Sequence, residues 1–420
     1  MKRFLLLLCT LLCLCGCDPD ERLAKERQMT LVYLAGNNNL SDNAVSDYND
    51  IKAGWLPTTR GSDKVLLVYH HYLLRDEKTY EVIDKTPVLV RLSKDRKGNV
   101  VEDIIQTYPE ETNSADPQTL ATVLADAEMA WPSAHHSIVL WSHGSGFLPP
   151  GYYRNPQERA QEDPVFTEAD PYAFMVKAGD DAIKSFAEDN GKEMDLLDLR
   201  KVLSRFHYDF IAFDCCLMGN IELAYELRNI CDYLLFSPTE ILTDGFPYEM
   251  MMQAIFNQPT ETALRNIAQS YMAHYRAYTD EMYQSATISL VSTAGLPALA
   301  SACQTVFHNH QDQILMIDRS RVQQYFRGDK HWYYDIDDLV KQVADDNEYR
   351  AFNRALNQAV IYRDATEYFF KDTDPYGMVH YDIKFEHYSG LSIYIPRPEY
   401  TVLNNYYKTL AWNQATGLVQ

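Results

Sequence analysis

The chain has 420 residues, 46% of them hydrophobic, which allows one large or two medium-sized domains with real cores. Its formal net charge is −21 at pH 7. A surface this acidic repels nucleic acid and anionic membrane faces, so composition argues against a DNA or RNA partner and favours cationic ligands.

The N-terminal segment has the features of an exported bacterial lipoprotein. Met1-Lys2-Arg3 is basic, residues 4–14 are almost wholly apolar, and Leu14-Cys15-Gly16-Cys17 follows. The apolar run is too short for a stable membrane-spanning helix but suits an export signal. We therefore predict a signal peptide over residues 1–16, lipid on Cys17 and a polar tether over 17–28, which places the protein in the cell envelope, periplasmic or surface-exposed. An ordinary secretory signal with incidental cysteines is the alternative.

The cysteines outside this N-terminal segment are too few for a disulfide framework. They are Cys215, Cys216, Cys231 and Cys303. Small secreted domains that depend on disulfides have a far higher density of cysteines. We therefore expect the fold to depend on a hydrophobic core.

Strands and helices alternate along the chain. The continuous apolar runs that predict buried strands cover residues 29–35, 64–71, 136–141, 210–213, 232–237 and 286–292, with an amphipathic strand at 86–93. Helical spacing and cap residues predict a helix capped near Ser41 or Asp42, and further helices over 114–131, over 195–206 with Asp195 as cap, from Ile221, and over 259–278.

This alternation predicts an α/β fold with a mostly parallel central sheet covered by helices on both faces. We expect the catalytic core to span 29–297. Residues 298–420 mix helices with a late strand pair around 377–381 and 390–396. Since no flexible linker precedes them, they are expected to form a C-terminal α+β extension packed on the core.

Residues 147–194 show neither the helical nor the strand spacing of apolar residues. The segment has few periodic apolar positions and many Pro, Gly and acidic residues. Structureless segments of this length in compact domains are usually functional lids or are processed.

Two of the predicted strands end on residues that can act together in catalysis. The strand at 136–141 leads to His143 and the strand at 210–213 leads to Cys216. The carboxyl ends of neighbouring parallel strands face one crevice, where a thiol and an imidazole can serve as nucleophile and base. A buried inert cysteine and an ordinary histidine at a strand end are the alternatives. Alternation along the strand points Cys215 to the opposite face, so we predict that Cys215 packs in the core.

The Gly144-Ser145-Gly146 sequence after His143 allows a close approach of backbone N–H groups to a substrate oxyanion. Ser145 is a weak nucleophile candidate, because a nucleophile elbow requires Gly where His143 stands. A structural zinc site is disfavoured because no closely spaced second ligand pair accompanies these residues.

Asp214 lies two residues before Cys216 and therefore on the same face of the strand end. It is either a structural acceptor for nearby N–H groups or the base of a pocket for a cationic side chain. The sequence leaves both interpretations open.

Several segments in order resemble the clostripain family (family C11) of caspase-like cysteine peptidases. They are Val32-Tyr-Leu-Ala-Gly-Asn-Asn-Asn-Leu40, Asp116-Pro-Gln-Thr-Leu120, Leu140-Trp-Ser-His-Gly-Ser-Gly-Phe147, Phe213-Asp-Cys-Cys-Leu-Met218 with Glu222, residues 237–248, and Gly390-Leu-Ser-Ile-Tyr-Ile-Pro396. The chain departs from the common pattern of the family at Ser142, at Cys215 and near Asn37, which leaves the His and Cys motifs untouched.

The resemblance implies a caspase-like α/β/α sandwich and an endopeptidase that cleaves after Arg or Lys. It implies a His143–Cys216 dyad, an oxyanion hole made by the backbone N–H groups of Gly144 and Cys216, and selection of the basic side chain by Asp214, with Asp244 as a second acid. It also implies self-processing after Arg154, Arg159 or Lys177, in a segment that contains Lys184 as well.

No cofactor is required for this chemistry, although calcium could brace so acidic a chain. The expected partners are protein or peptide substrates with basic residues, and the membrane through the lipid anchor. The alternative function is a catalytically silent surface-binding lipoprotein on the same fold, for which thirty tyrosines would suit glycan or peptide capture.

Overall fold

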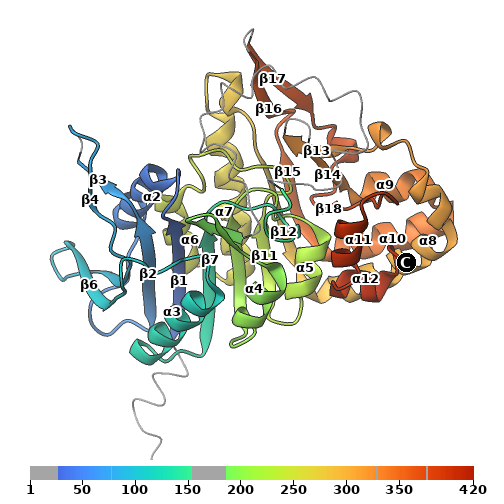
Figure 1. Cartoon of the computed structure of the whole chain (residues 1–420). Coiled ribbons are helices and arrows are strands. Elements are labelled where there is room, and N and C mark those ends of the chain that lie inside the picture. Colours follow the sequence, from blue (N-terminus) through green and yellow to red (C-terminus); the bar gives the residue numbers. More distant parts are fainter. Residues whose placement is uncertain (1–26, 77, 154–185, 328–329, 375–376) are drawn as a thin grey trace, which may run out of the picture.

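The computed structural model describes residues 27–76, 78–153, 186–327, 330–374 and 377–420 (Figure 1). The signal peptide, Cys17, and the processing candidates Arg154, Arg159, Lys177 and Lys184 lie outside the described residues. Within the described ranges, no helix is long and apolar enough to cross a membrane.

The strands of the described chain are β1 (Gln28–Gly36), β2 (Lys64–Tyr72), β3 (Leu74–Arg75), β4 (Val82–Asp84), β5 (Val88–Lys94), β6 (Val100–Thr107), β7 (His135–Trp141), β8 (Phe186–Asp189), β9 (Lys192–Met194), β10 (Tyr208–Asp214), β11 (Cys231–Phe236), β12 (Thr287–Ser292), β13 (Gln324–Arg327), β14 (Lys330–Asp335), β15 (Val360–Ala365), β16 (Tyr368–Asp374), β17 (Gly377–Asp382) and β18 (Ser392–Ile393).

The α-helices are α2 (Ser41–Ala53), α3 (Pro117–Ala130), α4 (Leu196–Leu203), α5 (Ile221–Leu227), α6 (Tyr248–Asn257), α7 (Thr260–Arg276), α8 (Leu296–Leu315), α9 (Ile336–Val343), α10 (Asp346–Ala359), α11 (Thr401–Tyr407) and α12 (Ala411–Thr416). Short 3-10 helices lie at Glu281–Tyr283, Thr293–Gly295, Arg319–Arg321 and Phe385–His387.

A nine-stranded sheet in the order β15-β12-β11-β10-β7-β1-β2-β5-β6 forms the centre of the described structure. The five strands from β11 to β2 are parallel, as the alternation of strands and helices predicts. Antiparallel strands extend both edges, with β5 and β6 beyond β2 and with β12 and β15 beyond β11. The expected α/β sandwich is confirmed, with antiparallel edges added to its parallel centre.

Helices cover both faces of this sheet, and that explains the continuous apolar runs of its strands. In β1, Leu31 and Tyr33 belong to one hydrophobic cluster together with α3, α4 and α5, which lie on the near face in Figure 1. Val32 and Leu34 belong to the other cluster, together with α2, α6 and α7. Successive side chains of a strand point to opposite faces, so burial on both faces requires an unbroken apolar sequence.

The predicted helix cap Asp195 is confirmed, two further caps are present at Asp116 and Asn220, and the cap predicted for α2 is not. Asp116, Asp195 and Asn220 each accept a hydrogen bond from a backbone N–H in the first turn of α3, α4 and α5. By contrast α2 begins at Ser41 after Leu40, without a side-chain cap. The prediction of a cap at Ser41 or Asp42 is wrong, because the Ser41 hydroxyl donates back to the turn at Gly36 O and Asn38 O.

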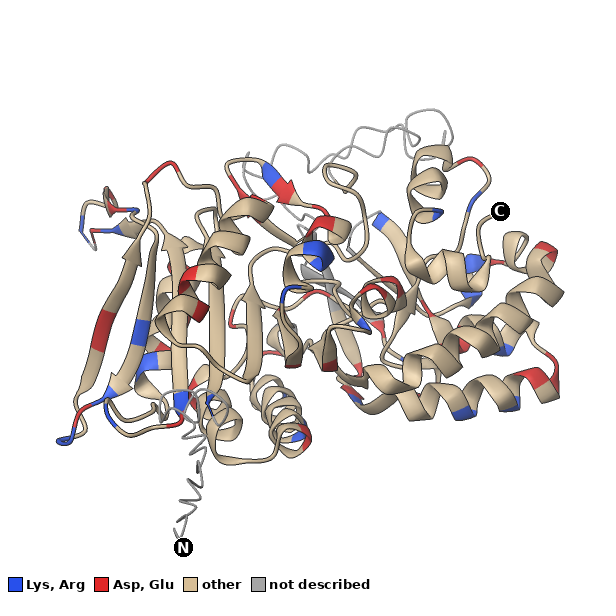
Figure 2. Ribbon diagram, turned by 90° about the horizontal axis from the view of Figure 1, so that it is seen from below, with Lys and Arg blue, Asp and Glu red and all other residues tan. Residues whose placement is uncertain are grey.

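The C-terminal residues pack directly on the front half of the chain. Strand β15 is the edge of the central sheet, and Glu222 in α5 accepts hydrogen bonds from Tyr394 N (2.9 Å) and Tyr407 Oη (2.7 Å). Figures 1 and 2 both show α8, α10 and the chain end at the side of the molecule opposite β6. The boundary placed at residue 297 stays a prediction.

The late strand pair is paired differently from the prediction. Strand β17 pairs with β16, and β18 pairs with β14. The reason is that β18 runs beside the turn after Cys216, where Ser392 N donates to Gly219 O at 2.9 Å. That contact separates β18 from β17.

Candidate active site

The register of two central strands brings the predicted dyad residues to equivalent positions. In the pairing of β7 with β10, Trp141 lies opposite Asp214, so His143 and Cys216 each follow their strand end by two residues. The two loops are in contact: a Cβ atom on Gly144 would lie 2.6 Å from the carbonyl oxygen of Cys216. Only glycine fits at that position, and the imidazole and the thiol share one end of the sheet.

The turn that carries Cys216 is held by the loop after β11. Leu217 has a positive φ of 61°, which is uncommon for a side chain of its size. Its N–H donates to Thr239 O at 2.8 Å, and Gly219 N donates to Ser237 O at 2.7 Å. These two hydrogen bonds stabilise the strained turn and hold Cys216 at the end of β10.

The two cysteines have opposite environments, as strand alternation predicts. Cys215 is buried, its Sγ donates to Leu140 O at 3.2 Å, and desolvation raises the pKa of its thiol well above the usual value. Cys216 is partly exposed, and its Sγ accepts a hydrogen bond from Ile241 N at 3.4 Å. A backbone N–H donor stabilises negative charge on sulfur, so Cys216 is the cysteine suited to nucleophilic attack.

His143 is nearly buried, and its Nε2 lies 2.7 Å from Asn39 Oδ1. Asn39 belongs to the turn after β1, the strand on the other side of β7. Asn39 was not predicted from the sequence. The available signal was the Gly36-Asn-Asn-Asn sequence at the carboxyl end of a strand that neighbours β7.

The other two asparagines of that turn bind the hairpin of β8 and β9. Asn37 Nδ2 donates to Asp189 Oδ1, and Asn38 Nδ2 donates to Glu188 O, both at 2.8 Å. The same hairpin reaches the histidine loop, where Ala187 N donates to His143 O at 3.2 Å. The hairpin therefore joins the asparagine turn to the loop of His143.

A cluster of buried polar groups around Asp189 holds this hairpin in place. Asp189 is fully buried, and its Oδ2 accepts from Ser114 N at 2.7 Å and lies 3.2 Å from His71 Nδ1. Asn113 Nδ2 donates to Asp189 O at 2.7 Å. These partners compensate the cost of burying a carboxylate.

Asp214 is buried beneath the Cys216 turn. Its Oδ2 accepts hydrogen bonds from Phe246 N (3.0 Å) and Tyr248 Oη (2.9 Å). Desolvation raises its pKa to about 6, although both hydrogen bonds act in the opposite direction. Gly245 has a φ of +58°, and a Cβ there would lie 2.7 Å from Asp214 Oδ2. Asp214 is thus a structural acceptor in this structure, and its role in substrate selection stays a prediction.

A second buried acid, Asp47 of α2, lies on the same side of the sheet and was not found from the sequence. Its Oδ2 accepts from Trp141 Nε1 at 2.7 Å. Desolvation, followed by the charge of Asp214, raises its pKa to about 9. The two carboxyl groups interact electrostatically below the end of the sheet, which together with burial favours the protonated form of Asp47.

Asp244 is half-exposed and lies beside Gly245, in the same loop that contacts Asp214. Its carboxylate accepts from Tyr278 Oη and lies 3.8 Å from His274 Nε2. The structure thus places both predicted substrate-binding acids around one loop.

Ser145 is buried, and its backbone carbonyl accepts a hydrogen bond from Tyr333 Oη. Burial makes Ser145 unsuitable as a nucleophile. Within the residues that the structure covers, no group of three or more His, Cys, Asp and Glu side chains could hold a metal ion. Acidic and basic residues are scattered over the ribbon in Figure 2.

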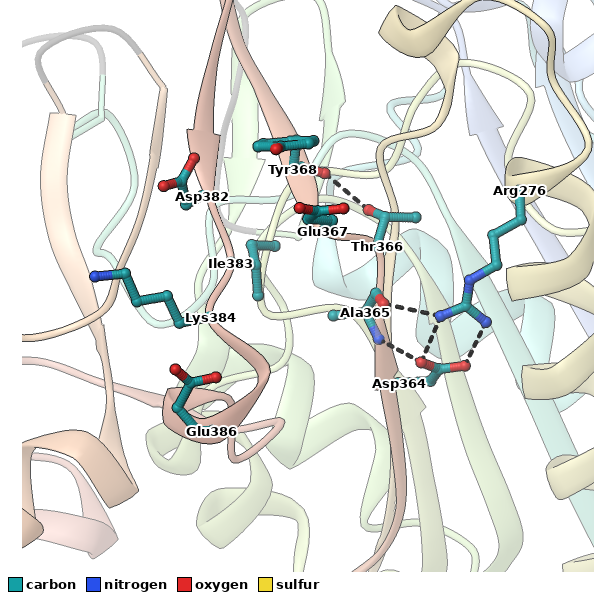
Figure 3. A pocket seen from close by; sticks show the side chains of 10 residues that line it. All are labelled: Arg276, Asp364, Ala365, Thr366, Glu367, Tyr368, Asp382, Ile383, Lys384 and Glu386. Carbon is teal, nitrogen blue, oxygen red and sulfur yellow. Dashed lines mark hydrogen bonds and ion pairs between the residues drawn. The ribbon is translucent and has the colours of Figure 1, made fainter.

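A separate pocket of about 480 Å³ lies where β15 leads into β16 (Figure 3). Asp364 at its wall pairs with both Arg276 guanidinium nitrogens at 2.7 Å. Its other charged lining residues are Glu367, Asp382, Lys384 and Glu386. The pocket contains none of the predicted site residues.

A partly exposed thiol and an imidazole at adjacent strand ends, within a helix-covered parallel sheet, are the features of a caspase-like cysteine peptidase. A crystal structure of an inactive zymogen C11 protease from Parabacteroides distasonis matches with a TM-score of 0.71 and 30% identity, covering 94% of this chain and 98% of that one. A secreted C11 cysteine protease from Bacteroides thetaiotaomicron, in complex with an irreversible peptide inhibitor, matches with a TM-score of 0.71 and 28% identity, covering 93% of this chain and 98% of that chain.

The sequence model of the clostripain family matches residues 32–161 and 180–417. The chain therefore belongs to the clostripain family of cysteine proteases. Clostripain from Hathewaya histolytica is 22% identical over 246 residues, which are 55% of this chain and 43% of clostripain. The match thus spans less than half of the length of that relative.

Proposed function

We propose that this protein is a lipid-anchored cysteine endopeptidase that cleaves after Arg or Lys through His143 and Cys216. The observation that carries the proposal is the register of β7 and β10, which sets the two side chains at equivalent strand ends, with Gly144 against the Cys216 carbonyl. Membership of a family of cysteine proteases supports the reaction class.

The mechanism follows from the chemistry of these groups. The Cys216 thiolate attacks the scissile carbonyl carbon, and the backbone N–H groups of Gly144 and Cys216 stabilise the oxyanion of the tetrahedral intermediate. The imidazolium of His143 protonates the leaving amine, which leaves an acyl-enzyme. Neutral His143 then takes a proton from water, hydroxide attacks the thioester, and the acid product leaves as the thiol and imidazole are restored.

Selection of a basic side chain is assigned to Asp214, assisted by Asp244. A buried carboxylate offers a cation a partner in a site of low polarity, and the charge of a bound Lys or Arg would offset the desolvation that raises the pKa of Asp214. Asp214→Asn should lower kcat/KM for Arg and Lys substrates far more than for a matched Leu substrate. Equal rates on Arg and Leu substrates in the wild type would contradict this assignment.

Self-processing between the two motifs is part of the proposal. Tyr153 packs on Trp332 with ring centroids 5.3 Å apart, so the chain before residues 154–185 is packed on the protein. Phe186 forms a bridge with Gly144, so the chain after them is held at the loop of His143. A cut after Arg154, Arg159 or Lys177 would fit the specificity proposed above. The inactive zymogen among the similar structures supports a precursor form.

The cell-envelope location and the lipid on Cys17 are proposed from the signal sequence. A Cys17→Ser variant should lose membrane partitioning or remain unprocessed, as followed by fractionation and intact mass. Wholly soluble wild-type protein would contradict the anchor without affecting the proposed activity. Calcium as a structural ion is a further proposal, and addition of a chelator followed by thermal unfolding would detect it.

Covalent labelling tests the enzyme proposal directly. Matched irreversible peptide inhibitors ending in Lys or Leu are incubated with the protein, and peptide mapping locates the added mass. We expect the Lys compound to modify Cys216 far faster than the Leu compound, and Cys216→Ala to remain unmodified while Cys215→Ala is labelled. A wild type that no such compound modifies would favour a silent binding protein.

A further inference from the structure

The contact between His143 and Asn39 defines the proton positions on the imidazole. An amide oxygen can only accept a hydrogen bond, so we assign the proton to His143 Nε2, which lies 2.7 Å from Asn39 Oδ1. The lone pair of the neutral ring is then on Nδ1. Consequently Nδ1 is the atom that can take a proton from the thiol and return it to the leaving amine.

The turn that presents Asn39 is fixed from several sides before any substrate binds. Asn38 Oδ1 accepts from Leu40 N, and Asn38 Nδ2 donates to Glu188 O, both at 2.8 Å. Asn37 Nδ2 binds the buried carboxylate of Asp189 at 2.8 Å. A turn held by these contacts of Asn37 and Asn38 can present the adjacent Asn39 to a partner at little cost in conformational entropy.

We propose that Asn39 is a positioning residue that sets the tautomer and ring orientation of His143 and stabilises its imidazolium. This inference rests on the proposed function, because it assigns His143 to proton transfer. A hydrogen bond from a charged N–H is about twice as strong as one between neutral groups. Asn39 therefore favours the thiolate–imidazolium pair over the neutral thiol and imidazole.

Two substitutions at Asn39 have opposite electrostatic effects. Asn39→Ala removes the acceptor and destabilises the imidazolium, so thiolate formation at Cys216 moves to higher pH. Asn39→Asp keeps an acceptor in the same place, adds a negative charge and moves thiolate formation to lower pH. Each midpoint should shift by about one pH unit, a macroscopic value that belongs to the coupled pair.

The other ionisable groups around the His143 loop stay the same in both variants. Those in contact with the loop or with the asparagine turn include Cys215, Cys216, Tyr333, Glu188 and Asp189. A difference between the Ala and Asp variants is therefore caused by the group at position 39.

The primary measurement is the rate of Cys216 alkylation by iodoacetamide from pH 4 to 9, quantified by peptide mapping. Alkylation reports on thiolate without any turnover, so it remains informative if no peptide substrate is cleaved. In parallel, kcat and KM are measured on a substrate with a basic residue. We expect Asn39→Ala to lower kcat by up to about 100-fold with KM nearly unchanged, and Asn39→Asp to recover part of the loss.

Asn357→Ala is the matched control, because this exposed residue of α10 donates only within its own helix, to Asn353 O at 2.8 Å. Thermal unfolding of every variant checks that folding is intact. Wild-type alkylation and kcat profiles in folded Asn39→Ala would overturn the proposal. Shifted alkylation profiles in a protein that cleaves nothing would support Asn39 as a positioning residue and count against the proposed function.

Discussion

The adjacent cysteines Cys215 and Cys216 in the turn after β10 have different surroundings, so one is suited to catalysis and the other to packing. We expect Cys216→Ala to abolish peptidase activity, because it removes the partly exposed thiol that accepts from Ile241 N. Cys215→Ala should retain most of the activity and lose only about 1 kcal/mol of stability, because a single buried atom is removed. Hydrolysis of a basic peptide and urea unfolding of both variants check this. Equal loss of activity in two folded variants would contradict the assignment.

The buried acid pair predicts a pH dependence of stability. An acid whose folded-state pKa is raised keeps its proton while the unfolded chain releases its own, so stability falls as pH rises from about 4 to the folded value. For Asp47 that window extends to about 9. Asp47→Asn preserves an acceptor for Trp141 and removes this fall in stability. The free energy of unfolding of the variant, relative to that of the wild type, should therefore increase between pH 5 and 8. Parallel unfolding curves of wild type and variant over that range would argue against a protonated Asp47.

At the scale of elements, the β8–β9 hairpin depends on Asp189. Asp189→Ala removes the acceptor of Ser114 N and Asn37 Nδ2, and it leaves His71 Nδ1 with Ser114 Oγ, at 2.8 Å, as its neighbour. We expect a loss of about 3 kcal/mol, because two N–H donors lose a carboxylate acceptor inside the protein. Urea unfolding measures it, with Asp346→Ala, an exposed residue in the first turn of α10, as the control. A loss under 1 kcal/mol would show that the hairpin does not depend on this carboxylate.

The sequence could predict those strands that are buried on both faces, because burial requires an unbroken run of apolar residues. Continuous apolar runs identify β1, β2, β7, β10 and β11, and those runs also place His143 and Cys216 at strand ends. Strand β6 was missed because its side chains are mostly exposed, and β8 was missed because it is short and includes Ala187 at a φ of +61°. The partners of β16, β17 and β18 depend on contacts distant in sequence. Asn39 could not be singled out among three asparagines without the backbone of the turn.

At the scale of the whole molecule, the proposed cut lies between two strands that pair in the centre of the sheet. We expect active wild-type enzyme to run as two fragments on a denaturing gel, cut within residues 147–194, with Cys216→Ala remaining one chain. Intact masses should place the cut after Arg154, Arg159 or Lys177. Fully active enzyme in a single uncut chain would exclude self-processing, and identical nicking in Cys216→Ala would assign the cut to another protease.

The pairing of β7 with β10 affects how such an enzyme can refold before and after the cut. After a cut between these strands, the sheet is an interface between two polypeptides, and unfolding releases two separate molecules. Refolding then requires an encounter, so the thermal midpoint of the cut form rises with protein concentration by mass action, while that of the precursor is independent of concentration. Dilution after denaturation would return the precursor to its fold and leave the cut enzyme dissociated. The precursor would thus refold as a single chain, whereas the activated enzyme would refold only when its two fragments associate.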